Sequence, residues 1–331
     1  MSLTTEQTND RSDQTLCGDL VCIPNGSELV TDADEEIFLL YTRLAGHRDQ
    51  SSVPLGLGFV DSKAPEIIVS FSIEPPLQLI EPPLEEKSSK RHAKRQSNPT
   101  ARKVVDFDIT LEQDPSSLQS RKGDTGSVLW RACVHLSRLI MLQHHFPPPP
   151  PSKPFLSSDR LPTTRVLELG AGIGLLACIL TPFVGHYTVT DMDALIPLIR
   201  KNVNRTLSAA DARKTLVTPL DWVLLHETPP ARRGSVFDLR LDGQFDLIIC
   251  CDCIYNTSLV PALVTTINYC TCSGNTAVLV VVELREEDVL RLFLEAWLSS
   301  GPWRVWKLPG ELLDSRTVGW VGQRLLCGLD V

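Results

Sequence analysis

A cluster of glycines follows a short apolar segment in the middle of the chain. Residues 165–169 (RVLEL) include Glu168 and run directly into the loop that begins with Gly170, Ala171 and Gly172. Glycines after a strand allow the backbone to approach a ligand closely, and the N-terminus of a following helix offers N–H groups to an anion. A dinucleotide fingerprint, G-x-G-x-x-G, would require glycine at position 175, where this chain has leucine. The segment predicts a cofactor site and disfavours a dehydrogenase.

Carboxylates stand at the ends of the next two strand-like segments. Asp191 ends the first of them, and there it can accept hydrogen bonds from both hydroxyls of a ribose. A helix N-cap is the alternative role for Asp191. Asp221 and Trp222 follow the second segment, residues 216–220. The indole could pack on an adenine ring, although a tryptophan at a strand end is more often part of the core.

A further carboxylate and a tyrosine follow residues 245–251 (FDLIICC), which end in Cys251. Asp252 comes next, and Tyr255 lies three positions further on. Burial beside an apolar wall would prepare the Asp252 carboxylate to accept a hydrogen bond from an amine. The alternative is a helix cap followed by a surface tyrosine.

Strand-like and helix-like segments alternate from residue 165 to about residue 300. Such alternation predicts an α/β fold with a doubly wound, mostly parallel sheet and helices on both faces. The strand-like segments are continuous apolar runs, as expected for strands that are buried on both faces. Ligands bind beyond the carboxyl ends of such strands, so the residues named above should gather at one edge of the sheet. A helix is expected at residues 127–142, before the first strand.

The N-terminal third has a different character. Residues 1–34 are polar and acidic, and we expect them to be disordered. Residues 35–119 form a strand-containing appendage, with strands expected at 67–73 and 104–111. The domain that carries the site is predicted to span residues 120–331.

Charge and cysteine content limit the functional classes. The net charge of −8 over 331 residues argues against a generic nucleic-acid binder. Residues 87–103 are the basic exception, and they leave open a nuclear signal, a contact with ribosomal RNA or a solvated loop. Ten unevenly spaced cysteines do not suggest a disulfide framework, so we expect a reducing cytoplasmic location, with the nucleus as an alternative. The pair Cys250 and Cys253 falls in or next to a buried strand, so no metal is expected. No apolar run approaches the ~20 residues of a membrane span.

The motifs taken in order resemble those of a known enzyme family. VLELGAGIG, TD, LDW and CDCIY, together with TGSVLW at residues 125–130, are similar to the family 16 seven-strand methyltransferases, which use S-adenosylmethionine. Many members methylate lysine side chains of proteins. The stretches VVELR (281–285) and LEAWL (294–298) resemble most the fungal ribosomal lysine N-methyltransferase 5 type. The resemblance covers about residues 120–331 and implies a Rossmann-like class I methyltransferase domain with a seven-strand sheet.

The resemblance also implies roles for individual residues. Trp130 would lie against the cofactor, the glycine loop would contact its methionine portion, and Asp191 would hold its ribose. Asp252 and Tyr255 match the D-x-x-Y motif of the family, which faces the substrate lysine. The full set predicted to bind S-adenosylmethionine is Trp130, Glu168, Gly170, Ala171, Gly172, Asp191, Asp221, Trp222 and Cys251.

Methyl transfer from a sulfonium to an amine needs a neutral amine, aligned in a site that excludes water. We expect Asp252 to accept a hydrogen bond from that amine. Tyr255 is expected to line the channel through which the lysine side chain enters, where its aromatic ring favours cations. The expected substrate is a protein, with a ribosomal protein as the leading candidate. The alternatives are another protein, a small-molecule acceptor, or a non-catalytic binding module with the same fold. The proline tract at 147–151 and the Arg-rich stretch at 226–243 depart from the compact family pattern and leave the substrate open.

Overall fold

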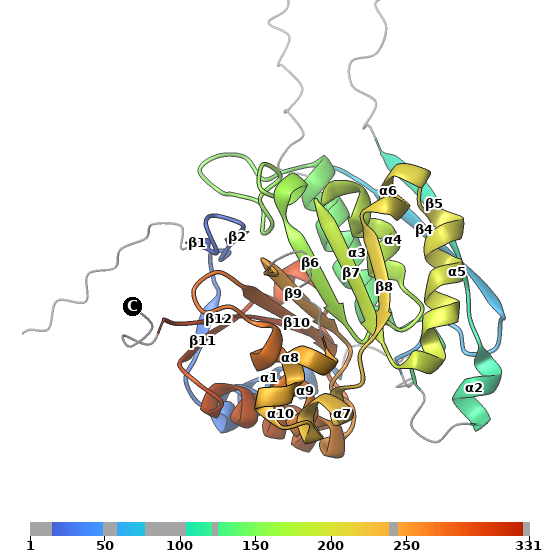
Figure 1. Ribbon diagram of the computed structural model, residues 1–331. Coiled ribbons are helices and arrows are strands. Elements are labelled where there is room, and N and C mark those ends of the chain that lie inside the picture. The colour runs from blue at the N-terminus through green and yellow to red at the C-terminus, as the bar shows by residue number, and fades with distance from the viewer. Residues whose placement is uncertain (1–14, 49–57, 77–103, 121–124, 238–243, 327–331) are drawn as a thin grey trace, which may run out of the picture.

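A computed structural model describes residues 15–48, 58–76, 104–120, 125–237 and 244–326. Its centre is an eight-stranded sheet in the order β3-β11-β12-β10-β9-β6-β7-β8 (Figure 1). From one edge to the other, these strands are β3 (Glu28–Val30), β11 (Trp303–Lys307), β12 (Thr317–Arg324), β10 (Ala277–Glu283), β9 (Leu247–Cys251), β6 (Arg165–Leu169), β7 (His186–Asp191) and β8 (Thr215–Pro219). The five strands from β10 to β8 are parallel, and β12, β11 and β3 are antiparallel to their neighbours. The predicted α/β fold with a mostly parallel sheet is confirmed.

Helices cover both faces of the sheet. On one face, the strands share a hydrophobic core with α3 (Arg131–His145), α4 (Leu175–Leu180) and α5 (Ile196–Thr206). On the other face, they pack with α1 (Ala33–Arg48), α7 (Trp222–Glu227), α9 (Val260–Cys270) and α10 (Glu287–Ser299). The remaining α-helices of the described residues are α2 (Pro115–Ser120), α6 (Ala209–Arg213) and α8 (Pro230–Val236). No helix in the described ranges is long and apolar enough to cross a membrane.

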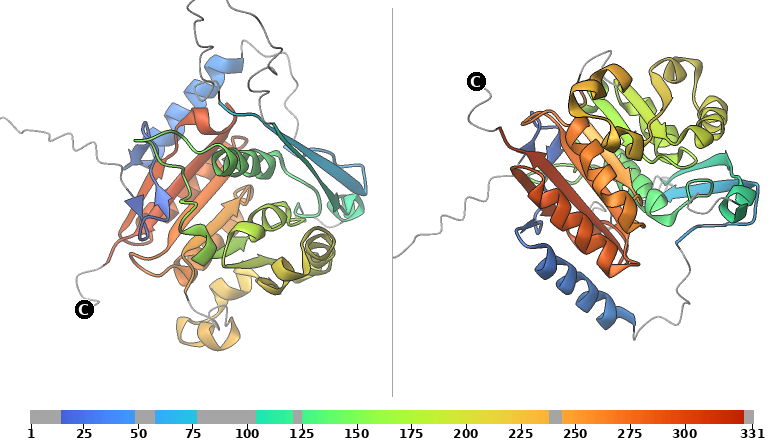
Figure 2. Two further views of the ribbon diagram at one scale, coloured as in Figure 1. Left: turned by 90° about the horizontal axis from the view of Figure 1, so that it is seen from above. Right: turned by 60° about the horizontal axis from the view of Figure 1, so that its bottom comes forward.

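The N-terminal segment is an integral part of the main sheet. The prediction that residues 1–34 are disordered is wrong for residues 15–34, because they form β1 (Thr15–Leu16), β2 (Val21–Cys22), β3 and the start of α1. β3 adds an eighth strand to the seven that were expected, by pairing with β11. Helix α1 then runs alongside α10 in the right-hand view of Figure 2. These strands are only two or three residues long, too short to show a hydrophobic period in the sequence.

The rest of the predicted appendage contains an antiparallel pair, β4 (Glu66–Ile73) and β5 (Val105–Glu112). Alternate side chains of β4 are buried, and the pair packs against α3 and α5. Both expected strands are thus present. The basic segment 87–103 lies outside the described residues, and the division of the chain at residue 120 stays a prediction.

One predicted helix begins later than expected. The segment expected to be helical from residue 127 enters α3 only at Arg131, because Trp130 has an extended backbone and forms a bridge with Phe59. Residues 125–130 therefore form a loop at the carboxyl edge of the sheet, next to the ends of β6, β7 and β9. This edge holds the candidate site.

Candidate functional site

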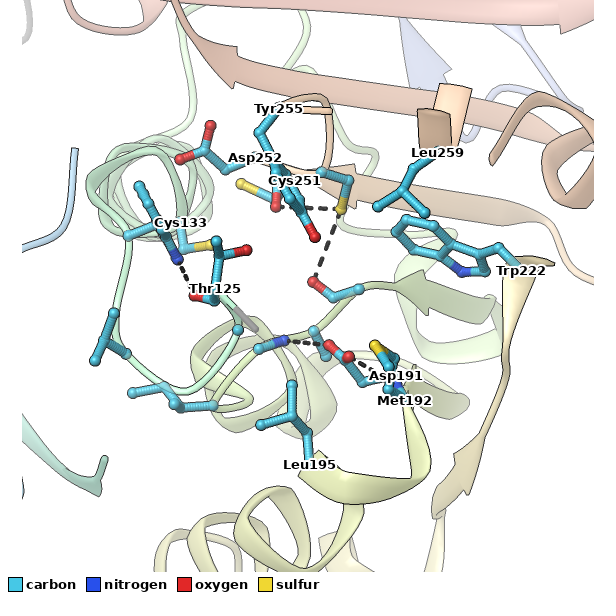
Figure 3. Close-up of a pocket in the computed structure, with 18 of the residues that line it drawn as sticks. Thr125, Cys133, Asp191, Met192, Leu195, Trp222, Cys251, Asp252, Tyr255 and Leu259 are labelled. Carbon is cyan, nitrogen blue, oxygen red and sulfur yellow. Dashed lines mark hydrogen bonds between the residues drawn. The ribbon is translucent and has the colours of Figure 1, made fainter. Parts of the chain in front are cut away.

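A cavity of about 200 Å³ lies where the parallel strands β6, β7, β8 and β9 end (Figure 3). Its walls come from the loop before α3, the glycine loop after β6 and the residues that follow the other three strands. Nearly all of the predicted site residues line it: Trp130, Gly170, Ala171, Gly172, Asp191, Asp221, Trp222, Cys251, Asp252 and Tyr255. The sheet topology thus brings together residues that are more than 120 positions apart in the chain.

The glycine loop borders this cavity closely. Gly170 has a φ of +69°, and a Cβ atom there would lie 2.7 Å from Cys253 Sγ and 3.1 Å from the Trp222 ring. A side chain at this position would therefore be strained and would intrude on the cavity wall. The absence of one leaves backbone exposed to a ligand, as the sequence predicted for a cofactor loop.

Asp191 ties the glycine loop to the end of β7. Its Oδ2 accepts a hydrogen bond from the Gly172 N–H at 2.8 Å, and its Oδ1 accepts one from the Met192 N–H at 2.7 Å. The side chain is largely buried and lines the cavity. Asp191 therefore fixes the shape of the loop, and its predicted contact with a ribose stays a prediction.

Asp221 and Trp222 form the opposite wall, after β8. Asp221 Oδ1 accepts hydrogen bonds from the Val223 and Leu224 N–H groups at 2.9 and 3.1 Å, which makes Asp221 the N-cap of α7. The Trp222 ring lies against the cavity, and its buried Nε1 has no hydrogen-bond partner among the described residues. An aromatic face is thus available for a flat ring such as adenine.

Glu168 is not among the residues that line this cavity, and its predicted contact with the cofactor stays a prediction. Alternation along β6 directs its side chain to the same face as Val166, into the core. There its Oε2 accepts a hydrogen bond from the Tyr187 hydroxyl at 2.9 Å. Burial raises the pKa of the Glu168 carboxyl to about 8, and the hydrogen bond from Tyr187 opposes that rise.

Asp252 and Tyr255 lie on the side of the cavity where β9 ends. In Figure 3 the Tyr255 side chain extends into the cavity, whereas the Asp252 carboxylate lies to one side of it. Asp252 Oδ1 accepts a hydrogen bond from the Glu283 N–H at 3.2 Å, and Oδ2 forms an ion pair with Arg285. Burial raises the pKa of the Asp252 carboxyl, and the Arg285 guanidinium opposes that rise.

Sequence reasoning did not identify the partners of Asp252. Arg285, Glu283 and Arg131 form a charged group behind the cavity wall, next to Asp252, and the Phe59 ring makes a T-shaped contact with the Trp130 ring. Glu283 and Arg285 are two positions apart at the end of an apolar strand, the spacing of side chains on one face of a strand. This spacing was the sequence signal that could have indicated a pair of charged side chains near Asp252.

The cysteines near the cavity behave as buried thiols. Cys253 Sγ lies 3.0 Å from the Leu169 carbonyl oxygen, and burial raises the pKa of the Cys251 and Cys253 thiols well above the usual range. Within the ranges that the structure describes, no group of three or more His, Cys, Asp or Glu side chains could hold a metal ion. The arrangement suits binding of an organic ligand, with the Asp252 carboxylate and three aromatic side chains, Trp130, Trp222 and Tyr255, in the lining.

The known proteins that this chain resembles have different names. The chain is 32% identical over 195 residues to a diaminohydroxyphosphoribosylamino-pyrimidine deaminase of Schizosaccharomyces pombe, a match that covers 56% of this chain and 41% of that protein. It is 30% identical over 131 residues to the protein N-lysine methyltransferase METTL21A of Danio rerio, which covers 40% of this chain and 55% of that protein. This chain thus spans only about half the length of either relative.

A third relative matches over most of both chains. The ribosomal lysine N-methyltransferase 5 of Zygosaccharomyces rouxii is 25% identical over 302 residues, which covers 80% of this chain and 88% of that protein. The profile of the lysine methyltransferase family matches residues 112–297, more than half of the chain and every strand that contributes to the cavity. The chain therefore belongs to the lysine methyltransferase family.

Proposed function

We propose that this protein is an S-adenosylmethionine-dependent protein-lysine N-methyltransferase that acts on a ribosomal protein. The observation that carries the proposal is the single cavity in which the glycine loop and Asp191 lie beside Asp252 and Tyr255. One part of this cavity suits a nucleoside cofactor, and the adjoining part suits an amine. Membership of the lysine methyltransferase family supports lysine as the acceptor.

The residues of the cavity fit the cofactor. The close approach permitted at Gly170 leaves room for the methionine portion, Asp191 is an acceptor for ribose hydroxyls, and Trp222 offers a flat apolar surface for adenine. When bound, S-adenosylmethionine supplies a methyl group that is already activated by the positive charge on its sulfur. The protein therefore needs no strong general base and has to align and dehydrate the acceptor.

Asp252 and Tyr255 are the residues that would receive the acceptor. A carboxylate has roughly four acceptor positions, and the Asp252 carboxylate uses two of them for Glu283 and Arg285. The others are available to accept a hydrogen bond from the substrate amine and orient its lone pair. Tyr255 and Trp130 form aromatic walls of the same cavity and exclude water from it.

The proposal of a ribosomal substrate is supported by the relative from Zygosaccharomyces rouxii, whose match runs over most of both chains. A ribosomal substrate in turn supports a cytoplasmic location, with the nucleus as the second expectation. The predicted contact of residues 87–103 with ribosomal RNA stays a prediction, and binding that weakens steeply with salt would support it. Another protein substrate is the second candidate, favoured by the match to METTL21A.

Two measurements test the proposal. Calorimetry should show binding of S-adenosylmethionine and none of NAD, because Leu175 replaces the glycine of the dinucleotide fingerprint. Ribosomal subunits are purified from cells that lack the enzyme and incubated with the protein and tritiated S-adenosylmethionine. A ribosomal protein should then be labelled. Label that appears only in the ribosome-free protein fraction would overturn the ribosomal substrate and favour the second candidate.

A further inference from the structure

Four charged side chains meet beside the end of β9, and among them only Asp252 lines the cavity. Arg131 Nη2 lies 2.7 Å from Glu283 Oε1, and Arg285 Nη2 lies 3.6 Å from Glu283 Oε2. Arg285 also forms the ion pair with Asp252. The side chains of Glu283 and Asp252 are almost fully buried, so each carboxylate depends on these arginines for its charge to be compensated.

Arg285 contacts the aromatic wall as well. Its guanidinium carbon lies 4.6 Å from the centroid of the Trp130 ring, in the geometry of a cation–π contact. The backbone of Gly58 also limits the position of the Arg285 guanidinium. It lies so close that a Cβ atom on Gly58 would collide with the guanidinium. Gly58 has a φ of +99°, a conformation that side chains other than glycine rarely adopt. One guanidinium is thus held among a carboxylate, an indole ring and the backbone of the N-terminal region.

We propose that Arg285 is a positioning residue for methyl transfer, which keeps Asp252 ionised and fixes both Asp252 and Trp130 beside the acceptor amine. The proposal rests on the proposed function and deepens it. Asp252 and Trp130 line the cavity, and Arg285 itself is absent from its lining, so Arg285 acts through these two neighbours. Glu283 in turn holds Arg285 through one carboxylate oxygen and pairs with Arg131 through the other.

The physical reason is the burial of Asp252. A buried carboxyl tends to be protonated, and a protonated Asp252 would be a poorer acceptor for an amine hydrogen bond. The nearby titratable groups are Arg285 and Glu283 at the end of β10, Arg131 and Cys133 on α3, Cys251 and Cys253 on its own segment, and Tyr255 beyond it. Arg285 is the cation in direct contact with the carboxylate, so its removal should move the Asp252 titration to higher pH.

The test compares Arg285→Gln and Arg285→Lys with Arg291→Gln, a matched arginine of α10 that pairs with Glu287 and Asp34 away from the cavity. At pH 7, Arg285→Gln should lower kcat/KM about 100-fold, because the acceptor is no longer aligned. The acidic limb of the pH–rate profile of Arg285→Gln should move to higher pH. Arg285→Lys keeps the positive charge, so its acidic limb should stay near that of the wild type while kcat is reduced. Arg291→Gln should match the wild type in both measurements.

A second readout needs no turnover. The Asp252 carboxyl can be followed by ¹³C NMR of aspartate-labelled protein without cofactor, with the resonance identified by its loss in Asp252→Asn. Its titration should shift to higher pH in Arg285→Gln and much less in Arg285→Lys. An unshifted titration, or a rate lowered by the same factor at every pH, would overturn the proposal. If the wild type methylates no protein, the proposed function fails, and the NMR titration still decides whether Arg285 controls Asp252.

Discussion

Asp252 has a backbone conformation that few residues adopt. Its φ of +59° lies in the left-handed region, where aspartate and asparagine are tolerated better than other side chains. The Asp252 N–H donates to the Val281 carbonyl at 2.7 Å, and the carboxylate accepts from the Glu283 N–H, so β10 holds this turn from both ends. The turn carries the carboxylate off the end of β9 and onto the wall of the cavity. Backbone strain at this position is consistent with a functional role.

The role of Asp252 can be tested by Asp252→Asn, which keeps the size of the side chain and tolerates the backbone conformation. Loss of the negative charge should lower the rate of methyl transfer by about 100-fold or more, because the amine loses its acceptor. The affinity for S-adenosylmethionine, measured by calorimetry, should stay unchanged. Asp193→Asn, an exposed carboxylate near the same cavity, is the control and should leave both quantities unchanged. Unchanged turnover of Asp252→Asn would exclude the proposed role.

Glu168 makes stability depend on pH. Its folded pKa of about 8 lies above the ordinary value of 4.5, so the folded state binds the proton more tightly than the unfolded state does. The stabilisation that comes from protonated Glu168 is fully present below pH 4.5. As the pH rises from there towards the folded pKa, the free energy of unfolding should fall by about 1.4 kcal/mol per pH unit.

Glu168→Gln should remove this part of the pH dependence, because glutamine resembles the protonated form. Urea unfolding of both proteins between pH 5 and 9 measures the difference. Glu295→Gln, an exposed site on α10, is the control. A constant difference between the wild type and Glu168→Gln over this range would show that Glu168 does not titrate in this way.

At the scale of secondary structure, the sheet could be predicted well from the sequence. The strand β6 has the predicted bounds, residues 165–169, because strands buried on both faces are continuous apolar runs. The contact of Asp252 with Arg285 could not be predicted, since it depends on the left-handed turn at Asp252 and joins residues 33 positions apart. The burial of the Glu168 side chain beside Tyr187 could not be predicted, because the motif gives the residue type but not the face of the strand.

The glycine loop yields a prediction about an element. Gly170→Ala places a Cβ atom against Cys253 and Trp222 at a backbone angle that favours glycine. The affinity for S-adenosylmethionine should fall at least about tenfold, since the loop has to shift away from its place against the cavity. Gly234→Ala in α8 is a matched control, because its Cβ atom would meet nothing within 4 Å. Equal affinities of the two variants would contradict this account of the loop.

At the scale of the whole molecule, the N-terminal segment is fastened to the far edge of the sheet. Lys307 of β11 is only 4% exposed and forms ion pairs with Glu28 of β3 and Glu36 of α1. Glu36 is 6% exposed and also accepts a hydrogen bond from Trp320 Nε1 at 3.0 Å. This cluster, in which Lys307 and Glu36 are buried, joins residues more than 270 positions apart. The N-terminal segment therefore contributes to the stability of the entire sheet.

Lys307→Met should destabilise the protein by about 3–5 kcal/mol, because it leaves the Glu36 carboxylate buried without its cation. Arg43→Met removes the other cation near Glu28, but that pair is more than half exposed and separated by 3.8 Å. Its effect should stay below about 1 kcal/mol. Urea unfolding followed by circular dichroism measures both. Equal effects of the two substitutions would contradict the view that burial decides the contribution of Lys307.

We propose that this cavity transfers a methyl group to a lysine of a protein. The most direct measurement is incubation of the purified chain with heavy-methyl S-adenosylmethionine and a fractionated lysate, followed by peptide mapping with mass spectrometry. We expect the heavy methyl on the side-chain nitrogen of a protein lysine with the wild type, and its absence with Asp252→Asn. Heavy methyl found only in small molecules, or equally abundant on lysine with Asp252→Asn, would contradict the account.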